Sequence, residues 1–217
     1  NWSLTEGLDR IGVAYKELFK RTKGYKTVSC LEDTAGGGST IGGPFDQLAA
    51  LRERIVSGTG QPERIGFCLD TCHLHAFGYD MSTRATAGAA LAEFDRLCGF
   101  ANLRVWHLND SKGKLASRLD RHQHIGEGWI GGGAKAHTGE GTFDERALKS
   151  SGFAEVLANP VFGQVPKIME TPKDDRESPD GEPLDSMNLA RLRSLVAQEA
   201  GAPGTASKRT TGPGTGR

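Results

Sequence analysis

The sequence predicts an α/β fold in which this chain supplies about four βα units of a parallel (β/α)8 barrel. Four apolar runs alternate with stretches of helical periodicity, and each run ends on a polar side chain: Glu32, Asp70, His107 or Glu170. The first two intervals between these residues each suit one βα unit, and the longer third interval suits a unit with an inserted loop. Because the carboxyl ends of parallel barrel strands meet at one mouth, we expect the four side chains to converge there.

The first elements are predicted as helix, strand and helix. Apolar residues recur at helical spacing over 3–21, and a Ser-x-x-Glu capping box begins at Ser3. An apolar run predicts a strand at 26–32. A glycine-rich turn then leads to a helix over 44–57, where Pro44 suits the first turn.

The middle of the chain repeats this alternation. A second strand is predicted at 64–70 and a third at 103–108, with a helix over 83–98 between them. The segment 109–142 is polar and rich in glycine, so we expect a loop there.

The last elements are a helix near 143–158, a fourth strand at 165–170 and a closing helix over 185–196. Only a helix and a tail fit after the fourth strand, so these are predicted to be the C-terminal four units, with the earlier strands upstream in a longer chain. We expect residues 1–197 to form a partial barrel domain. Residues 198–217, which lack large apolar side chains, are expected to be disordered.

Composition excludes some classes of protein. The chain has 27 basic and 27 acidic residues, so bulk charge implies no nucleic-acid partner and any such surface must be local. No apolar run is long enough to cross a membrane. The four cysteines lie in or beside apolar runs without a C-x-x-C pair, which indicates buried, reduced thiols. We therefore expect an intracellular protein: cytoplasmic in a bacterium, nuclear or mitochondrial in a eukaryote.

Seven residues carry side chains of the kind that bind metal ions: Glu32, Asp70, His73, His107, Asp120, His122 and Glu170. Carboxylate oxygen with imidazole and no thiolate suits Zn²⁺, Mn²⁺ or Fe²⁺ better than Ca²⁺. Seven ligands exceed the needs of one tetrahedral ion, so two or more ions are predicted. The alternative for any single residue is a strand-end cap or an ordinary interior histidine.

Five segments between residues 27 and 172 carry a family resemblance: LEDTAGGGSTIGG, GFCLDTCHLHAFGYD, WHLNDSKG, SRLDRHQHIGEG and IMETP. They resemble, in order, the signature segments of the endonuclease IV family of abasic-site DNA endonucleases. The resemblance implies a TIM barrel with three zinc ions, Mn²⁺ being a second candidate. It also implies a monomer that hydrolyses double-stranded DNA on the 5′ side of an abasic site, leaving a 3′-hydroxyl and a 5′-deoxyribose phosphate.

The resemblance also implies individual roles. Glu32 would bridge two metals and act with Glu170 in catalysis. Asp70, His107 and Glu170 would complete the second metal's ligands, and the third metal would be held by His73, Asp120 and His122. Two further histidines, for the first metal, lie outside this chain. The chain departs from the family at Asp33, where Asn is usual, and in 131–145, which is longer than the family's turn.

The loop after the third strand concentrates positive charge, with Lys112, Ser117, Arg118 and Arg121 as candidate DNA contacts. Phosphate neutralisation would give affinity without sequence preference, whereas the alternative is a solvated loop. Asn109 and Asp110 are predicted to orient the ligands.

Two other functions remain open. A sugar isomerase or epimerase of the xylose isomerase-like barrel type gathers similar residues around a single ion, so the pair Asp120 and His122 is the discriminating feature. An inactive fragment of the nuclease would keep the ligands without catalysis.

Overall fold

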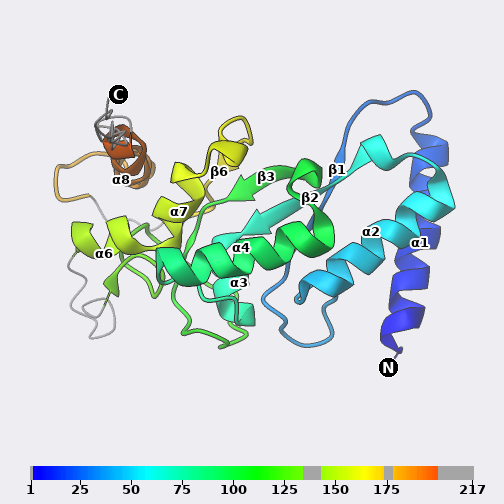
Figure 1. Cartoon of the computed structure of the whole chain (residues 1–217), viewed down its shortest axis with the longest axis horizontal. Coiled ribbons are helices and arrows are strands. Elements are labelled where there is room, and N and C mark those ends of the chain that lie inside the picture. The colour runs from blue at the N-terminus through cyan, green and yellow to red at the C-terminus, as the bar shows by residue number, and fades with distance from the viewer. Residues whose placement is uncertain (1, 134–142, 174–177, 200–217) are drawn as a thin grey trace, which may run out of the picture.

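Parallel strands form the centre of the computed structural model, which describes residues 2–133, 143–173 and 178–199 (Figure 1). The four strands pair in the order β1-β2-β3-β6 and run parallel throughout. Their bounds are β1 Ser29–Glu32, β2 Ile65–Asp70, β3 Leu103–His107 and β6 Lys167–Ile168. The predicted parallel α/β arrangement is therefore confirmed; its place within a complete barrel stays a prediction.

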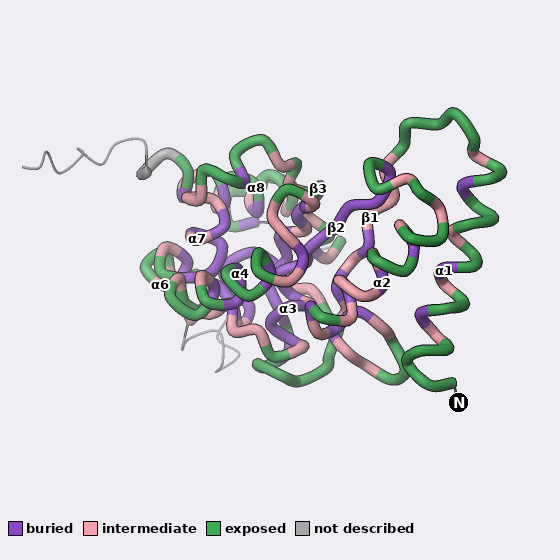
Figure 2. The backbone as a smooth tube through the Cα atoms, turned by 45° about the vertical axis from the view of Figure 1, so that its right-hand side comes forward, coloured by how far each residue is buried: buried purple, intermediate pink, exposed green. Residues whose placement is uncertain are grey.

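Helices lie before, between and after the strands along the chain. They are α1 (Leu4–Arg21), α2 (Phe45–Thr59), α3 (Thr71–Phe77), α4 (Arg84–Cys98), α6 (Glu145–Ser150), α7 (Gly152–Ala158) and α8 (Leu184–Glu199). α1 packs on α2, α2 on α4, α4 on α7 and α7 on α8. Figure 2 shows β2 buried along its length, while α1 alternates buried and exposed residues. None of the described helices is both long and apolar enough to cross a membrane.

Aromatic side chains fill the space between the sheet and these helices. Phe67 of β2 meets Phe94 of α4 edge-to-face at 5.6 Å, and Phe94 meets Phe45 of α2 at 5.3 Å. Trp106 is fully buried, and its ring centre lies 5.4 Å from that of Phe162. Burying one such side chain contributes about 1.5–3 kcal/mol, so this cluster anchors β2 and β3, whose ends carry predicted ligands.

The predicted helix over 143–158 is wrong in one respect, because it is two helices separated at Ser151. Gly152 explains the break. Its N–H donates to the carbonyl of Met81, and a Cβ there would lie 2.7 Å from that oxygen. The chain therefore bends to bring the Gly152 backbone against this carbonyl before helix α7 begins.

Other boundaries differ by small amounts. β1 and β6 are shorter than the predicted strands, and α8 continues to Glu199. Within the predicted loop 109–142, β4 (Asp110–Ser111) pairs antiparallel with β5 (His122–Gln123). Residues 200–217 of the predicted tail lie outside the described part of the chain. The cysteines are all described and form no disulfide; three are buried, whereas Cys30 is only half-buried, contrary to prediction.

Candidate metal centre

The four strand-end residues meet at one edge of the sheet. Glu32, Asp70 and His107 are the last residues of β1, β2 and β3, and Glu170 follows β6 by two positions. One ligand atom from each lies within 4.8 Å of all the others. Nδ1 of His107 is 3.1 Å from Glu32 Oε1, 3.4 Å from Glu170 Oε2 and 3.8 Å from Asp70 Oδ2. One imidazole nitrogen thus faces three carboxylates.

The other three predicted ligands form a second group beside the first. Nε2 of His73 lies 3.2 Å from Asp120 Oδ1, and Nε2 of His122 lies 3.5 Å from the same oxygen. His122 Nε2 is also 3.6 Å from Asp70 Oδ2. The structure therefore brings all seven predicted residues together, with Asp70 adjacent to both groups.

Hydrogen bonds fix which imidazole nitrogens face this cluster. Nδ1 of His73 is 3.0 Å from the carbonyl of Asp33, and Nδ1 of His122 is 3.0 Å from the carbonyl of Glu170. A carbonyl only accepts, so each Nδ1 carries a hydrogen, and Nε2 is the nitrogen of each ring that could bind a cation. His122 Nε2 is buried and has no hydrogen-bond partner among the described residues. A cation held by the second group would satisfy it, so the side chains present fit a metal ion.

Asn109 orients two of the carboxylate residues, as predicted. Its Nδ2 donates to Asp70 Oδ2 at 2.6 Å, and its Oδ1 accepts from the backbone N–H of Glu170 at 2.7 Å. The same prediction is wrong for Asp110. Its carboxylate instead accepts backbone N–H groups of the following loop, from Ser111, Gly126, Ile130 and Gly131.

Negative charge exceeds positive charge in the cluster. Burial raises the pKa of Asp70, and it raises the pKa of Asp33 well above its ordinary value. Burial alone would lower the pKa of His73, but carboxylates led by Asp70 and Asp33 outweigh it and bring the pKa to about 9. A hydrogen bond to Glu32 raises the pKa of His107. Protons balance the carboxylates in the metal-free chain, and a cation would replace them.

Asp33 provides a test of this charge balance. Its Oδ1 accepts the backbone N–H of Asp70, and its Oδ2 finds no donor among the described residues. Because the pKa of Asp33 is raised in the folded chain, the folded state binds this proton more tightly than the unfolded state does. Stability is therefore lost as the pH rises from the ordinary pKa of Asp, about 4, towards the raised value. Asp33→Asn removes this loss. We expect the melting temperature of the metal-free variant to exceed that of the wild type by more at pH 8 than at pH 5. Calorimetry in EDTA would show this, and a pH-independent difference would contradict it.

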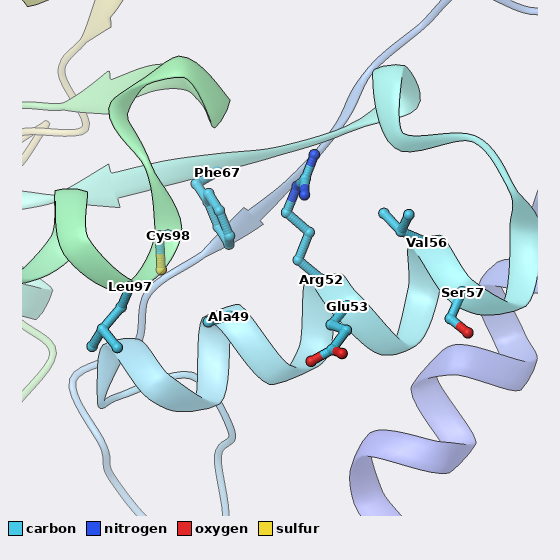
Figure 3. A pocket seen from close by; sticks show the side chains of 8 residues that line it. All are labelled: Ala49, Arg52, Glu53, Val56, Ser57, Phe67, Leu97 and Cys98. Atoms are coloured by element: carbon cyan, nitrogen blue, oxygen red, sulfur yellow. The ribbon is translucent and has the colours of Figure 1, made fainter.

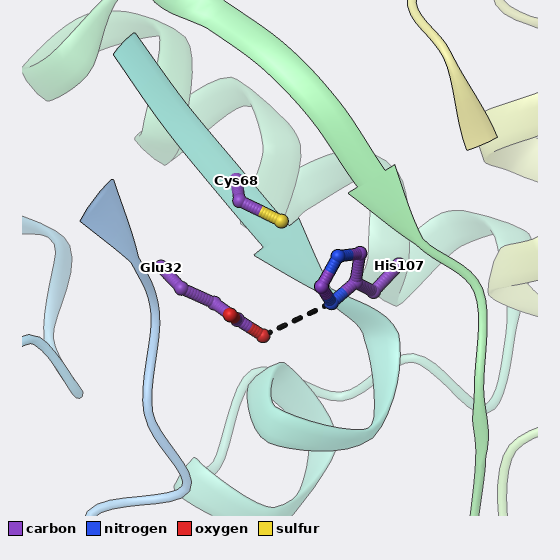
Figure 4. A group of neighbouring side chains, drawn as sticks. All are labelled: Glu32, Cys68 and His107. Atoms are coloured by element: carbon purple, nitrogen blue, oxygen red, sulfur yellow. Dashed lines mark hydrogen bonds and ion pairs between the residues drawn. The ribbon is translucent and has the colours of Figure 1, made fainter. Parts of the chain in front are cut away.

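Cys68 is a neighbour of the cluster that sequence reasoning missed (Figure 4). Its Sγ lies within 4.8 Å of ligand atoms of Glu32 and His107. The available signal was its position two residues before Asp70, which places both on one face of β2. Burial, followed by the charge of Glu32, raises the pKa of this thiol. A protonated thiol is a poor ligand, so we leave it outside the predicted set.

A pocket elsewhere has no part in this chemistry. It measures about 300 Å³ and lies between α2 and α4 (Figure 3). Its lining includes Arg52 and Glu53 of α2, Leu97 and Cys98 of α4, and Phe67 of β2. None of the seven ligand-type residues lines it.

Comparison with known proteins places this chain in a family. A family model described as a xylose isomerase-like TIM barrel matches residues 1–138, more than half of the chain. The chain belongs to this family. The predicted TIM barrel class is therefore confirmed.

Similarity to individual proteins makes the resemblance to endonuclease IV more specific. The chain is 39% identical over 189 residues to a protein named probable endonuclease 4 from Trichlorobacter lovleyi, covering 87% of the chain and 58% of that relative. It is 40% identical over 190 residues to a namesake from Geobacter sulfurreducens, covering 88% and 55%. The crystal structure of endonuclease IV from Thermus thermophilus matches with a TM-score of 0.65 and 30% identity, covering 88% of the chain and 58% of that structure. The predicted resemblance to endonuclease IV is confirmed, and the chain spans just over half the length of these relatives.

The predicted DNA contacts share one exposed loop beside the cluster. Lys112, Ser117, Arg118 and Arg121 are all exposed and lie between β4 and β5, which pair outside the four-stranded sheet. Arg118 does not extend freely, since its guanidinium lies 4.0 Å from the centre of the Phe77 ring. Contact of these side chains with DNA stays a prediction.

Proposed function

We propose that this chain carries the metal-binding part of a DNA repair endonuclease. The enzyme would hydrolyse the phosphodiester on the 5′ side of an abasic site, leaving a 3′-hydroxyl and a 5′-deoxyribose phosphate. The observation that supports this most is the convergence of seven ligand-type side chains in a chain whose relatives are named probable endonuclease 4. Double-stranded DNA containing abasic sites is the proposed partner, and the protein is proposed to act as an intracellular monomer.

The side chains would divide between ions according to their grouping. Glu32, Asp70, His107 and Glu170 would hold one zinc, and a second would lie between His73, Asp120 and His122. A third would use Glu32 and residues outside this chain; Mn²⁺ is the alternative ion. Bound in this way, the ions would lower the pKa of water and offset negative charge on the reacting phosphate.

The protein's own groups would prepare this reaction. Asn109 holds the Asp70 side chain and the Glu170 backbone, so it fixes the spacing between two carboxylates. The side chains of Glu32 and Glu170 are 37% and 50% exposed, so both are reachable by a substrate phosphate. Lys112, Ser117 and Arg121, on the adjacent loop, would contact flanking phosphates and position the duplex.

A single-metal sugar isomerase or epimerase is the second candidate. The group of Glu32, Asp70, His107 and Glu170 would by itself hold one ion, and the family description is shared with isomerase-like barrels. The approach of Asp120 to both His73 and His122 favours a second ion and hence the nuclease. An inactive fragment is a further alternative, since the chain spans just over half of its relatives' length.

The direct test uses a duplex with one abasic site and an undamaged duplex of the same sequence. We expect a longer protein containing this chain to cleave only the damaged strand, with loss of cleavage in EDTA and recovery on adding Zn²⁺. Sugar isomerisation without cleavage would reject the proposal. Cleavage by the longer protein but not by the isolated chain would identify the chain as an inactive fragment.

A further inference from the structure

The loop that carries Asp120 rests on the helix that carries His73. It connects β4 to β5, and between them its backbone caps the end of α3. The N–H of Ala116 donates to the carbonyl of His75 at 3.1 Å, and that of Arg118 donates to Ala76 at 2.9 Å. These carbonyls belong to the last turn of α3, where no helical donor remains for them.

Arg118 fastens this contact with its side chain. Its guanidinium lies over the ring of Phe77, the last residue of α3, with 4.0 Å between Cζ and the ring centre. Its backbone has a positive φ of 58°, which is uncommon for a residue with a side chain, and so does that of Ala116 at 59°. A loop held in such a conformation needs contacts that compensate for it.

A third segment closes over the stacked pair. Gly36, in the turn after β1, has a positive φ of 74°. A Cβ at Gly36 would lie 2.6 Å from Arg118 Nη1 and 2.7 Å from Phe77 Cδ2. The turn after β1, helix α3 and the loop therefore meet at one point, and Gly36 leaves the space that the guanidinium occupies. We call Gly36, Phe77 and Arg118 the clamp.

Arg118, the loop residue of the clamp, lies two positions before Asp120 and four before His122. Asp120 is 60% exposed on its side chain, so little packing of its own holds it 3.2 Å from His73 Nε2. His122 is fixed by the β4–β5 pairing and by its bond to the Glu170 carbonyl. The position of Asp120 therefore depends more than that of His122 on how the loop packs against α3. Arg118 makes that packing contact.

We propose that Arg118 is a positioning residue for the metal ion held by His73, Asp120 and His122, acting through its stacking on Phe77. The proposal rests on the metal centre of the proposed function. It gives Arg118 a role different from the predicted phosphate contact, because the face of its guanidinium is engaged by Phe77 and Gly36 within the protein.

Zinc affinities of the full 217-residue chain, measured by competition with a chromophoric chelator, test the role directly. We expect Arg118→Met to weaken the binding of one of the two zinc ions about 10–100-fold and to leave the affinity for the other unchanged. Gly36→Ala should have the same effect without altering charge, since its Cβ would displace the stacked guanidinium. Arg118→Lys should fall between, because an ammonium lacks the planar face. Arg10→Met is the matched control: Arg10 also stacks on an aromatic ring, that of Trp2, and should leave both affinities unchanged.

DNA binding separates the two roles of Arg118. The salt dependence of binding to an abasic duplex is measured for Arg118→Met beside Arg121→Met, where loss of a phosphate contact should reduce the slope by about 1. The proposal would be overturned if Arg118→Met kept both zinc affinities but showed a reduced slope for the salt dependence of DNA binding. It would also be overturned if the variant lost affinity equally for both zinc ions. If the wild type binds no second ion, the metal centre itself fails, and that result is visible before any variant is compared.

Discussion

Replacing Glu170 by Gln is expected to lower turnover on abasic-site DNA by at least about 100-fold, with little loss of DNA binding. Glu170 Oε2 lies 3.4 Å from His107 Nδ1 within the strand-end group. Gln keeps the shape of the side chain and removes the charge that a cation would require. The Glu170 backbone bond to Asn109 remains, so the fold should persist. Single-turnover cleavage and equilibrium binding, measured on a longer protein containing this chain, give the two quantities.

Glu145→Gln is the control for this substitution. Glu145 forms an exposed pair with Lys149 on α6, and pairs of this kind contribute little. Its turnover should match the wild type. Wild-type turnover in Glu170→Gln would remove Glu170 from the catalytic assignment, whereas equal losses of binding and turnover would indicate a role in folding or DNA contact.

Asp110→Ala is expected to destabilise the chain by roughly 3 kcal/mol or more, because it leaves buried N–H donors without an acceptor. The Asp110 carboxylate is fully buried and accepts backbone N–H groups at 2.8–3.1 Å from four positions, including Gly126 and Ile130. A loss of that size should lower the melting temperature by roughly 6 °C or more for a chain of this length. Calorimetry of the metal-free chain measures it.

Asp144→Ala is the variant against which this loss of stability is compared. Asp144 caps helix α6 through two backbone N–H groups near the protein surface. Removing such a cap costs about 1 kcal/mol. A similar small change in both variants would show that the loop after β3 does not depend on Asp110.

Sequence alone indicated the strands because each apolar run stops on a polar residue, and the structure places Glu32, Asp70 and His107 at the last position of their strands. It missed α3, which begins directly after β2. The Asp70 side chain caps that helix by accepting the N–H groups of Cys72 and His73, so one residue ends a strand and starts a helix. An Asp that ends an apolar run predicts the end of a strand, and the seven residues of α3 are too few to show a helical period of their own.

Long-range contacts explain the remaining differences. Asp110 accepts N–H groups from residues 16 to 21 positions away, which no local pattern in the sequence records. Arg118 was predicted as a phosphate contact from its charge, and only the fold reveals Phe77 beneath it. Spacing also could not show that Asp70 would lie beside both ligand groups. Those associations depend on how three loops pack at one edge of the sheet.

The number of zinc ions bound by the purified chain shows whether the seven side chains form two metal sites. The chain is equilibrated with Zn²⁺, dialysed and analysed for metal, together with His122→Ala. We expect two ions per wild-type chain and one in the variant, because His122 belongs to only one of the two groups. A wild-type chain that retains no zinc, or a single ion that His122→Ala leaves in place, would contradict it.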